Sequence, residues 1–167
     1  TFPFIYEVNG LTVNANLSDF SSCFNINSLV VEQNQSFIAN ERAIEQFKRL
    51  LISLEISELD ANSIIDQIID WIDTDDQPRA NGFEDYFYTG PINFRPMYTN
   101  KRLLINLSEL NNLPIFKDFT NPILFEKVCV HPLSYSNEVN INTMDVDDSY
   151  FLTSIFPNIS LTDAEFI

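Results

Sequence analysis

The sequence predicts an α+β fold that is mostly α-helical, and three observations support this. Residues 4–17 contain strand-like stretches on either side of Asn9-Gly10, whereas after Asn40 the apolar residues recur at helical spacing. The chain of 167 residues also has 45% hydrophobic residues, with 15 Phe, 6 Tyr and 1 Trp, so it can bury a substantial core despite a net charge of -15. We therefore expect one domain, or a compact domain with an extension.

The negative charge limits the kinds of partner. With 9 Lys+Arg against 24 Asp+Glu, the chain would be repelled by nucleic-acid phosphates and by anionic membrane surfaces, so nucleic-acid binding is not expected. No stretch contains the roughly 18 apolar residues that a membrane helix needs. The chain starts with apolar residues and without Met, which is typical of a mature or trimmed piece of a longer protein.

The first elements in order are a β-hairpin and two amphipathic helices. Asn9-Gly10 predicts the hairpin, because both residues tolerate a positive φ at the turn. The first helix begins after Asn40, and its apolar face carries Ile44, Phe47, Leu50, Leu51 and Leu54. The second helix has Asp60 or Asn62 as its expected cap, and its apolar stripe comprises Ile64, Ile65, Ile68, Ile69 and Ile72. The change from strand to helix periodicity divides the chain into a strand part, residues 1–35, and a helical part, residues 36–167.

Three later segments also predict helices: residues 106–113, 121–130 and 145–156. The segment 121–130 opens with Asn121 as cap and Pro122 at the first helical position, where the missing N–H of proline costs nothing. A last capping box, Ser160 with Asp163, is followed by only four residues, so the natural chain is expected to continue beyond residue 167.

The two cysteines, Cys23 and Cys129, fit neither a metal cluster nor a redox pair by their spacing. The favoured interpretation is that both are small residues of the core. A disulfide between them is the alternative, and it would require an oxidising compartment. The single histidine, His131, is expected to pack near a helix end rather than to act as a general base.

Six carboxylates crowd residues 70–88, directly after the second helix: Asp70, Asp73, Asp75, Asp76, Glu84 and Asp85. Two like charges about 4 Å apart repel by roughly 4 kcal/mol at an effective dielectric near 20, so a fold that gathers them needs a cation. The C-terminus of a helix is itself negative, which adds backbone carbonyls to this group of hard oxygen donors. Calcium, which takes six to eight oxygens at flexible geometry, is the expected ion.

The spacing of these acids is close to that of an EF-hand loop. With Asp73 at position 1, Asp75 falls at 3, Gln77 at 5, Asn81 at 9 and Glu84 at 12. Proline takes the place of the required glycine at position 6, and the residues after Glu84 are too rich in aromatics, Gly and Pro for an exiting helix. We therefore predict calcium bound by Asp73, Asp75 and Glu84 in a loop that is not an EF-hand. A solvated acidic loop without metal is the alternative.

Catalysis is not expected. The chain shows no nucleophile elbow, and with only Gly10, Gly82 and Gly90 it has no phosphate-binding glycine loop. The remaining enzymatic interpretation is a glycosidase, in which a carboxylate pair such as Asp73 and Glu84 would act as acid and base.

Two other features are expected to serve packing. The end of the chain, residues 141–167, resembles a helix-hairpin-helix, but Pro157-Asn158 replaces its glycine turn. An aromatic cluster is predicted to pack in the core or under loops, although an exposed patch of it would suit a protein interface. The cluster comprises Tyr86, Phe87, Tyr88, Phe94 and Tyr98.

Several motifs in order resemble the K-type minor pseudopilin of the bacterial type II secretion system. That family has an Asp-Trp-Ile-Asp-x-Asp stretch followed by Gly-x-Glu-x-x-Tyr, an Asn, a Ser-x-Glu-Leu motif and an Asn-x-Asn-Thr segment. The matching residues here are Asp70 to Asp73 and Asp75; Gly82, Glu84 and, one residue late, Tyr88; Asn100; Ser108, Glu109 and Leu110; and Asn140, Asn142 and Thr143. Upstream, the positions Asp19, Phe24, Asn25 and Asn27 match a further family segment.

The resemblance implies a non-enzymatic subunit at the tip of the periplasmic pseudopilus, beside the I-type and J-type minor pseudopilins. Such a subunit helps to initiate or cap the pseudopilus that exports proteins across the outer membrane, and it can contact the secreted proteins. In that family a hydrophobic N-terminal helix, which this chain lacks, anchors the subunit in the inner membrane. The alternative function is a calcium-stabilised acidic interaction module of another secreted or periplasmic protein.

For the fold, the resemblance implies that residues 1–35 belong to a pseudopilin αβ scaffold. Residues 36–167 would then form a large helical insertion that is SAM-like or helix-hairpin-helix-like. Calcium would brace loops of this insertion, with Asp76 and Asp85 as further candidate ligands and a second ion near residues 140–145.

Overall fold

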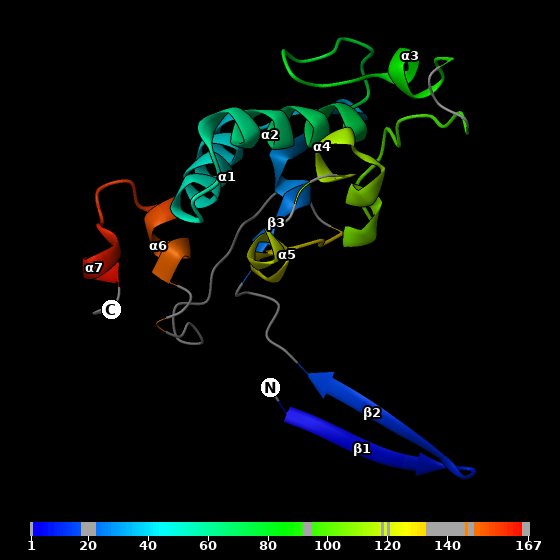
Figure 1. Ribbon diagram of the computed structural model, residues 1–167, viewed down its shortest axis with the longest axis vertical. Helices are drawn as coiled ribbons and strands as arrows, with labels where there is room; N and C mark the ends of the chain where they lie inside the picture. Colours follow the sequence, from blue (N-terminus) through cyan, green and yellow to red (C-terminus); the bar gives the residue numbers. More distant parts are fainter. Residues whose placement is uncertain are drawn as a thin grey trace.

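Short two-stranded pairings and a helical body make up the fold, which confirms the α+β prediction (Figure 1). The computed structural model describes residues 2–17, 23–91, 95–117, 119, 121–132, 146 and 149–164. Across these residues, no helix combines the length and the apolar character needed to cross a bilayer. The motif at Asn140 to Thr143, the predicted second ion and Asp19 lie outside the described residues.

The predicted hairpin is confirmed. Strands β1 (Phe2–Val8) and β2 (Leu11–Leu17) pair antiparallel, and the turn residues Asn9 and Gly10 have φ values of 52° and 78°. The hairpin lies apart from the helices in Figure 1. Several of its apolar side chains are exposed, including Ile5 at 70%. An isolated two-stranded hairpin is marginally stable in water, so these side chains lack the covering that a larger sheet would give.

Strand pairing continues past residue 35. The turn at Asn34 and Gln35 joins β4 (Val30–Gln33) to β5 (Ser36–Ala39), which pair antiparallel. Further upstream, β3 (Phe24–Asn25) pairs in parallel with β6 (Val128–Cys129). The 3-10 helix η2 (Ile26–Leu29) connects β3 to β4, and it is buried in the same core as the helices. The predicted division near residue 35 therefore falls inside a hairpin that packs on the helical body.

Cys23 and Cys129 form a disulfide, so the favoured prediction of two unpaired core cysteines is wrong. Their Cα atoms are 5.6 Å apart, although 106 residues separate them in sequence. The parallel pairing of β3 with β6 places Asn25 opposite Cys129 and so brings Cys23 within disulfide reach. This pairing is a long-range contact that neither cysteine's local sequence reveals.

The two long helices begin at polar caps. Helix α1 (Glu41–Ser53) starts after Asn40, whose side chain accepts a hydrogen bond from the backbone N–H of Ala43. Helix α2 (Glu58–Ile72) starts after Ser57, whose hydroxyl accepts from the N–H of Asp60. The predicted caps Asp60 and Asn62 are therefore wrong, because Ser57 caps the helix one turn earlier.

The apolar stripes of α1 and α2 meet in the core, as their spacing predicted. Fully buried side chains from both helices fill it: Phe47, Leu50, Leu51, Ile64, Ile68, Ile69 and Ile72. Phe24 of β3 stacks on Phe47 at 4.7 Å between ring centroids, which joins the strands to this core.

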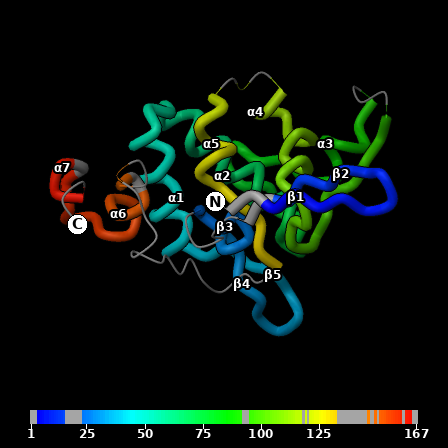
Figure 2. Tube along the Cα trace, turned by 90° about the horizontal axis from the view of Figure 1, so that it is seen from below, coloured from blue at the N-terminus to red at the C-terminus, as the bar shows by residue number. Residues whose placement is uncertain are grey.

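Short helices surround α1 and α2. They are α3 (Asp85–Tyr88), the 3-10 helix η3 (Leu107–Asn112), α4 (Pro114–Lys117), α5 (Pro122–Lys127), α6 (Ser149–Ile155) and α7 (Leu161–Ala164). The predicted helix 121–130 ends at Lys127, because the chain turns extended to pair β6 with β3. Figure 2 shows α6 beside α1, with α7 on the far side of α6, and Arg49 Nε of α1 donates to the carbonyl of Ser154 in α6 at 2.9 Å.

A buried asparagine ties the distant segments together. Asn27 is fully buried, and its amide nitrogen donates to the carbonyls of Leu104 at 2.9 Å and His131 at 2.6 Å. Its amide oxygen accepts from the N–H of Leu104 at 2.9 Å. One side chain therefore pairs three buried or half-buried backbone groups that come from two different loops.

Candidate metal centre

Three carboxylates converge after the C-terminus of α2. Helix α2 ends at Ile72, and Asp73 follows as its C-terminal cap, with its N–H donating to the carbonyl of Ile69 at 2.8 Å while its own backbone is already extended. The chain then loops out and returns at Glu84, the residue before α3 (Figure 1). One carboxylate oxygen from each of Asp73, Asp75 and Glu84 lies within 4.8 Å of the other two. The structure thus brings together the three residues that the spacing singled out.

Two of these carboxylates are buried. Asp73 is 5% exposed and Glu84 is 2% exposed, whereas Asp75 faces solvent. Within the part of the chain that the structure describes, no hydrogen-bond donor reaches Oδ1 of Asp73 or either carboxylate oxygen of Glu84. An ionised carboxylate in such surroundings is strongly disfavoured unless a cation accompanies it.

The pKa values show the same deficit of positive charge. Burial, followed by repulsion from Asp75 and Asp70, raises the pKa of Asp73 to about 7. Burial, followed by repulsion from Asp73 and Asp70, raises the pKa of Glu84 to about 8. Both groups therefore hold protons near neutral pH unless a cation replaces them.

Asp75 forms the open edge of the group. Its Oδ1 accepts a hydrogen bond from the N–H of Gln77 at 2.7 Å. This bond from the backbone two residues later to the Asp75 side chain forms an Asx-turn. Because Asp75 is exposed, an ion held here would keep water on that side, as calcium commonly does.

The remaining candidate ligands are used elsewhere. Asp76 is exposed and forms an ion pair with Lys101. Asp85 accepts two hydrogen bonds through Oδ1, from the N–H of Thr99 at 2.7 Å and from its hydroxyl at 2.8 Å. Neither joins the group of three carboxylates. Asn81, which an EF-hand register would point at the ion, turns its amide to Asp66 instead.

Asp66 is a part of this site that sequence reasoning missed, and Asp70 was counted among the crowded carboxylates without a role of its own. Asp70 is fully buried, and burial raises its pKa to about 6, although a hydrogen bond from the N–H of Arg79 acts in the opposite direction. Asp66 is 8% exposed and binds Arg79 and Asn81. The available signal was their spacing of four and seven residues from Asp66 to Asp70 and Asp73, which puts all three on one helix face.

Aromatic rings form one wall beside the group. Trp71 and Tyr88 are both 3% exposed and meet edge to face, 5.1 Å between centroids. Burial, with the charges of Asp70 and Glu84, raises the pKa of the Tyr88 hydroxyl. The packing prediction is correct for Tyr88 but wrong for Tyr86 and Tyr98, which are 62% and 69% exposed.

Phe87 and Phe94 are the remaining members of the predicted aromatic cluster. Phe87 stacks on Phe83 at 4.1 Å between ring centroids and packs against the core, as predicted. Phe94 lies outside the described residues.

The donor set is all oxygen, which suits calcium better than zinc or copper, since those metals favour nitrogen and sulfur ligands. Three carboxylates supply enough negative charge to offset a divalent ion. The residues present therefore fit a calcium ion, which Asp73, Asp75 and Glu84 would hold.

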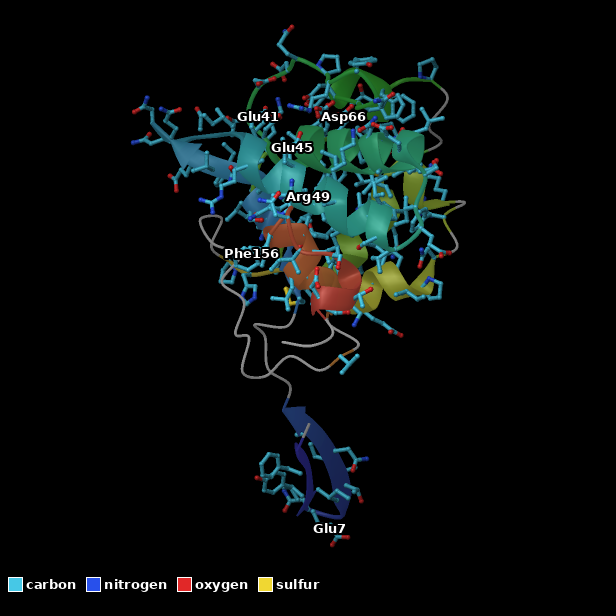
Figure 3. All side chains as sticks on the ribbon, turned by 90° about the vertical axis from the view of Figure 1, so that its left-hand side faces the viewer. Glu7, Glu41, Glu45, Arg49, Asp66 and Phe156 are labelled. Carbon is cyan, nitrogen blue, oxygen red and sulfur yellow. A yellow bond between two sulfur atoms is a disulfide. The ribbon has the colours of Figure 1, made fainter. Side chains whose placement is uncertain are left out.

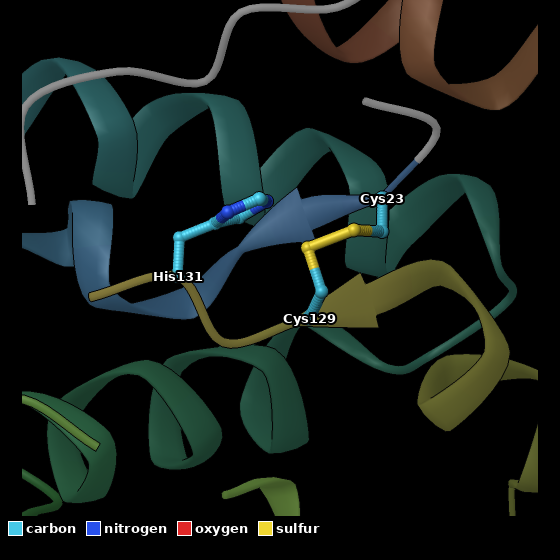
Figure 4. Close-up of side chains that lie close together, drawn as sticks. All are labelled: Cys23, Cys129 and His131. Atoms are coloured by element: carbon cyan, nitrogen blue, oxygen red, sulfur yellow. A yellow bond between two sulfur atoms is a disulfide. The ribbon is translucent and has the colours of Figure 1, made fainter. Parts of the chain in front are cut away.

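A second gathering of metal-ligand types contains Cys23, Cys129 and His131, whose ligand atoms also lie within 4.8 Å of one another (Figure 4). The two sulfurs are bonded to each other, so neither is available as a thiolate ligand. The backbone N–H of His131 donates to the side chain of Asn25 at 3.0 Å, which fixes this segment against β3.

Known proteins with similar sequences all come from one family. A family model described as type II secretion system (T2SS), protein K, matches residues 22–133. The chain is 29% identical over 156 residues to type II secretion system protein K of Pectobacterium carotovorum subsp. carotovorum, covering 92% of this chain and 46% of the relative. It is 29% identical over 164 residues to the protein of the same name from Klebsiella pneumoniae, covering 95% of this chain and 48% of that relative. The chain thus spans about half the length of the curated relatives it matches.

A solved structure has the same fold. It is described as the crystal structure of the GspK-GspI-GspJ complex from the type 2 secretion system of enterotoxigenic Escherichia coli. The TM-score is 0.72 at 24% sequence identity, and the alignment covers 92% of this chain and 53% of that chain. The family model matches 112 residues, well over half of the chain, in the region that contains the disulfide, the core and the carboxylate group, and so this chain belongs to the type II secretion system protein K family.

Proposed function

We propose that this chain is part of a non-enzymatic minor pseudopilin, in which a calcium ion bound by Asp73, Asp75 and Glu84 braces the helical domain. The observation that supports calcium is the burial of Asp73 and Glu84 with carboxylate oxygens that lack any donor among the described residues. A cation at this point would join the end of α2 to the start of α3 and so fix the loop between them. The role of the metal is structural: it holds a surface in shape.

The position of this subunit is the second part of the proposal. In the complex with the same fold, the K protein is assembled with GspI and GspJ. We propose that this chain likewise binds an I-type and a J-type minor pseudopilin at the tip of the pseudopilus, where it helps to initiate or cap assembly and contacts secreted proteins. The exposed apolar side chains of the β1–β2 hairpin suit a role in the pseudopilin scaffold, which would cover them.

A periplasmic location agrees with the disulfide, since such bonds persist in oxidising compartments. Anchoring in the inner membrane through a helix outside this sequence belongs to the same proposal.

Thermal unfolding tests the calcium site. We expect calcium at about 100 times its dissociation constant to add roughly 2.7 kcal/mol, or about 5–10 °C in melting temperature for a domain of this size. Asp75→Ala should abolish the increase, because it removes a ligand from the exposed edge without emptying the core. Asp76→Ala is the matched control, since this neighbouring aspartate pairs with Lys101 outside the group, and it should retain the increase. A wild-type melting temperature that is the same in calcium and in chelator would rule out the site.

Capture of purified I-type and J-type pseudopilins tests the proposed partners. We expect the wild type to bind them in calcium and to bind less in chelator, and Asp75→Ala to bind weakly in both. Calcium-dependent stability without capture of either pseudopilin would instead favour the alternative function, an acidic interaction module of another secreted or periplasmic protein.

A further inference from the structure

Three aspartates lie on one face of α2 but have two different uses. Asp66, Asp70 and Asp73 are spaced by four and three residues, so their side chains leave the helix on the same side. Only Asp73 joins the carboxylate group of the candidate metal centre. Asp66 and Asp70 instead contact the segment 79–82, which is the returning part of the acidic loop. Figure 3 shows Asp66 on the side of α2 that carries this loop.

The contacts of Asp66 and Asp70 join two buried carboxylates to the half-buried residues Arg79 and Asn81. Asp66 accepts from Nε of Arg79 at 2.9 Å through Oδ1, and from the N–H and the amide of Asn81 at 3.1 Å and 2.9 Å through Oδ2. Asp70 accepts from the N–H of Arg79 at 3.1 Å through Oδ2. Hydrogen bonds to an ionised acceptor are about twice as strong as neutral ones, so these contacts hold the segment firmly.

Gly82 allows the backbone to approach the helix this closely. A Cβ at this position would overlap the carboxylate of Asp70 and would come within 3.0 Å of the backbone carbonyl of Asp66. Glycine is therefore required at position 82 because there is no space for a side chain. Two residues after this point of closest approach, the chain delivers Glu84 beside Asp73.

We propose that Asp66 and Asp70 are positioning residues, which hold Arg79 and Gly82 against α2 so that Glu84 stands ready to bind the ion. This inference rests on the proposed calcium site, and it assigns control of the affinity to residues that do not touch the metal. A loop already closed loses less conformational entropy when the ion binds, and it presents Glu84 at the right distance from Asp73. We call the contacts of Asp66 and Asp70 with Arg79 and Gly82 the clasp. If the clasp is opened, Glu84 leaves the coordination shell and water takes its place.

Terbium, which occupies calcium sites, provides a readout that a purely structural role would not change. Trp71, the single tryptophan of the chain, lies two residues before Asp73 and can sensitise its luminescence. The luminescence lifetimes in H2O and in D2O give the number of water molecules on the ion. Calcium affinity is measured in parallel by competition with terbium.

The test uses Arg79→Gln, which removes the guanidinium and keeps the backbone N–H, together with Gly82→Ala as an independent way to open the clasp. Glu84→Gln is the reference for loss of a ligand. The matched control is Lys48→Gln, which removes an ion pair of similar length, 2.8 Å, between Lys48 and Glu58. Melting temperatures in chelator identify any variant that fails to fold, and Arg79→Gln decides the test if Gly82→Ala is one of these.

We expect Arg79→Gln to weaken calcium binding on the order of tenfold, the loss of one strong hydrogen bond. It should also raise the number of bound waters toward that of Glu84→Gln, whereas Lys48→Gln should match the wild type in both. The inference is overturned if Arg79→Gln lowers the melting temperature but keeps the wild-type affinity and water number. If the wild type itself binds neither terbium nor calcium, the proposed calcium site fails, and this inference fails with it.

Discussion

Glu84→Gln should have opposite effects on stability with and without calcium. The substitution keeps the shape of the side chain and removes its ability to ionise. In the folded protein without metal, Glu84 holds its proton up to a pKa of about 8, while in the unfolded chain it releases the proton near 4.5. Between these two values the folded state binds more protons than the unfolded state, so this group makes the protein less stable as the pH rises.

The size of the effect follows from that difference. A single group with raised pKa removes about 1.4 kcal/mol of stability per pH unit across the window, which is on the order of a few kcal/mol by pH 8. Asp73, whose pKa is also raised, adds to the same trend in the wild type. A buried glutamine amide without partners costs about 1–3 kcal/mol in turn. We therefore expect Glu84→Gln to stabilise the metal-free protein at pH 8 by about 2 kcal/mol, or roughly 4–8 °C.

Melting curves at pH 5.5 and pH 8, in metal-free buffer and in calcium, check this prediction. Without metal, the variant should exceed the wild type at pH 8 and lose that advantage at pH 5.5, where Glu84 of the wild type is protonated in the folded state. In calcium at pH 8 the order should reverse, because only the wild type keeps all three carboxylate ligands. A variant that is less stable than the wild type at pH 8 without metal would refute the reasoning, since Glu84 would then not be an uncompensated buried charge.

Two further predictions concern the frame around the site. Cys129→Ser should lower the free energy of unfolding by about 4–5 kcal/mol, because the disulfide closes a loop with a sequence separation of 106, and a reducing agent should lower the wild type by the same amount in chemical denaturation. An equal stability of oxidised and reduced wild type would contradict this. Asn27→Ala should cost about 3 kcal/mol or more, because it removes the three hydrogen bonds that this buried side chain forms with backbone groups of Leu104 and His131, whereas the exposed control Asn111→Ala should change stability by less than about 0.5 kcal/mol.

Features set by neighbouring residues could be predicted from the sequence. Asn9-Gly10 specifies its turn through its own backbone preferences, and the periodic apolar residues of α1 and α2 define the faces that meet in the core. The sequence predicts the start of α2 too late, because aspartate is a residue type that often caps helices and Asp60 precedes the apolar stripe. In the structure Ser57, three residues earlier, is the cap, and its hydroxyl accepts from the N–H of Asp60.

Features set by distant residues could not be predicted. The disulfide depends on the pairing of β3 with β6, whose strands have only two residues each and carry no pattern that identifies the partner. In the acidic loop, spacing singled out Asp73, Asp75 and Glu84, but the sequence did not separate them from Asp76 and Asp85, which the family resemblance added as further candidate ligands. That separation depends on Lys101 and Thr99, which approach from a later segment. The contacts of Asp66 and Asp70 could not be predicted for the same reason, since their partners lie across the loop.

The most direct test of the calcium site is a crystal structure of this chain grown in calcium, with anomalous scattering used to identify the ion. We predict a calcium peak about 2.3–2.6 Å from carboxylate oxygens of Asp73, Asp75 and Glu84, with water completing the shell on the side of Asp75. A crystal at saturating calcium in which Asp73 and Glu84 remain buried with no ion between them would contradict the account. The acidic loop would then be held by protonated carboxyl groups and by the clasp of Asp66 and Asp70 alone.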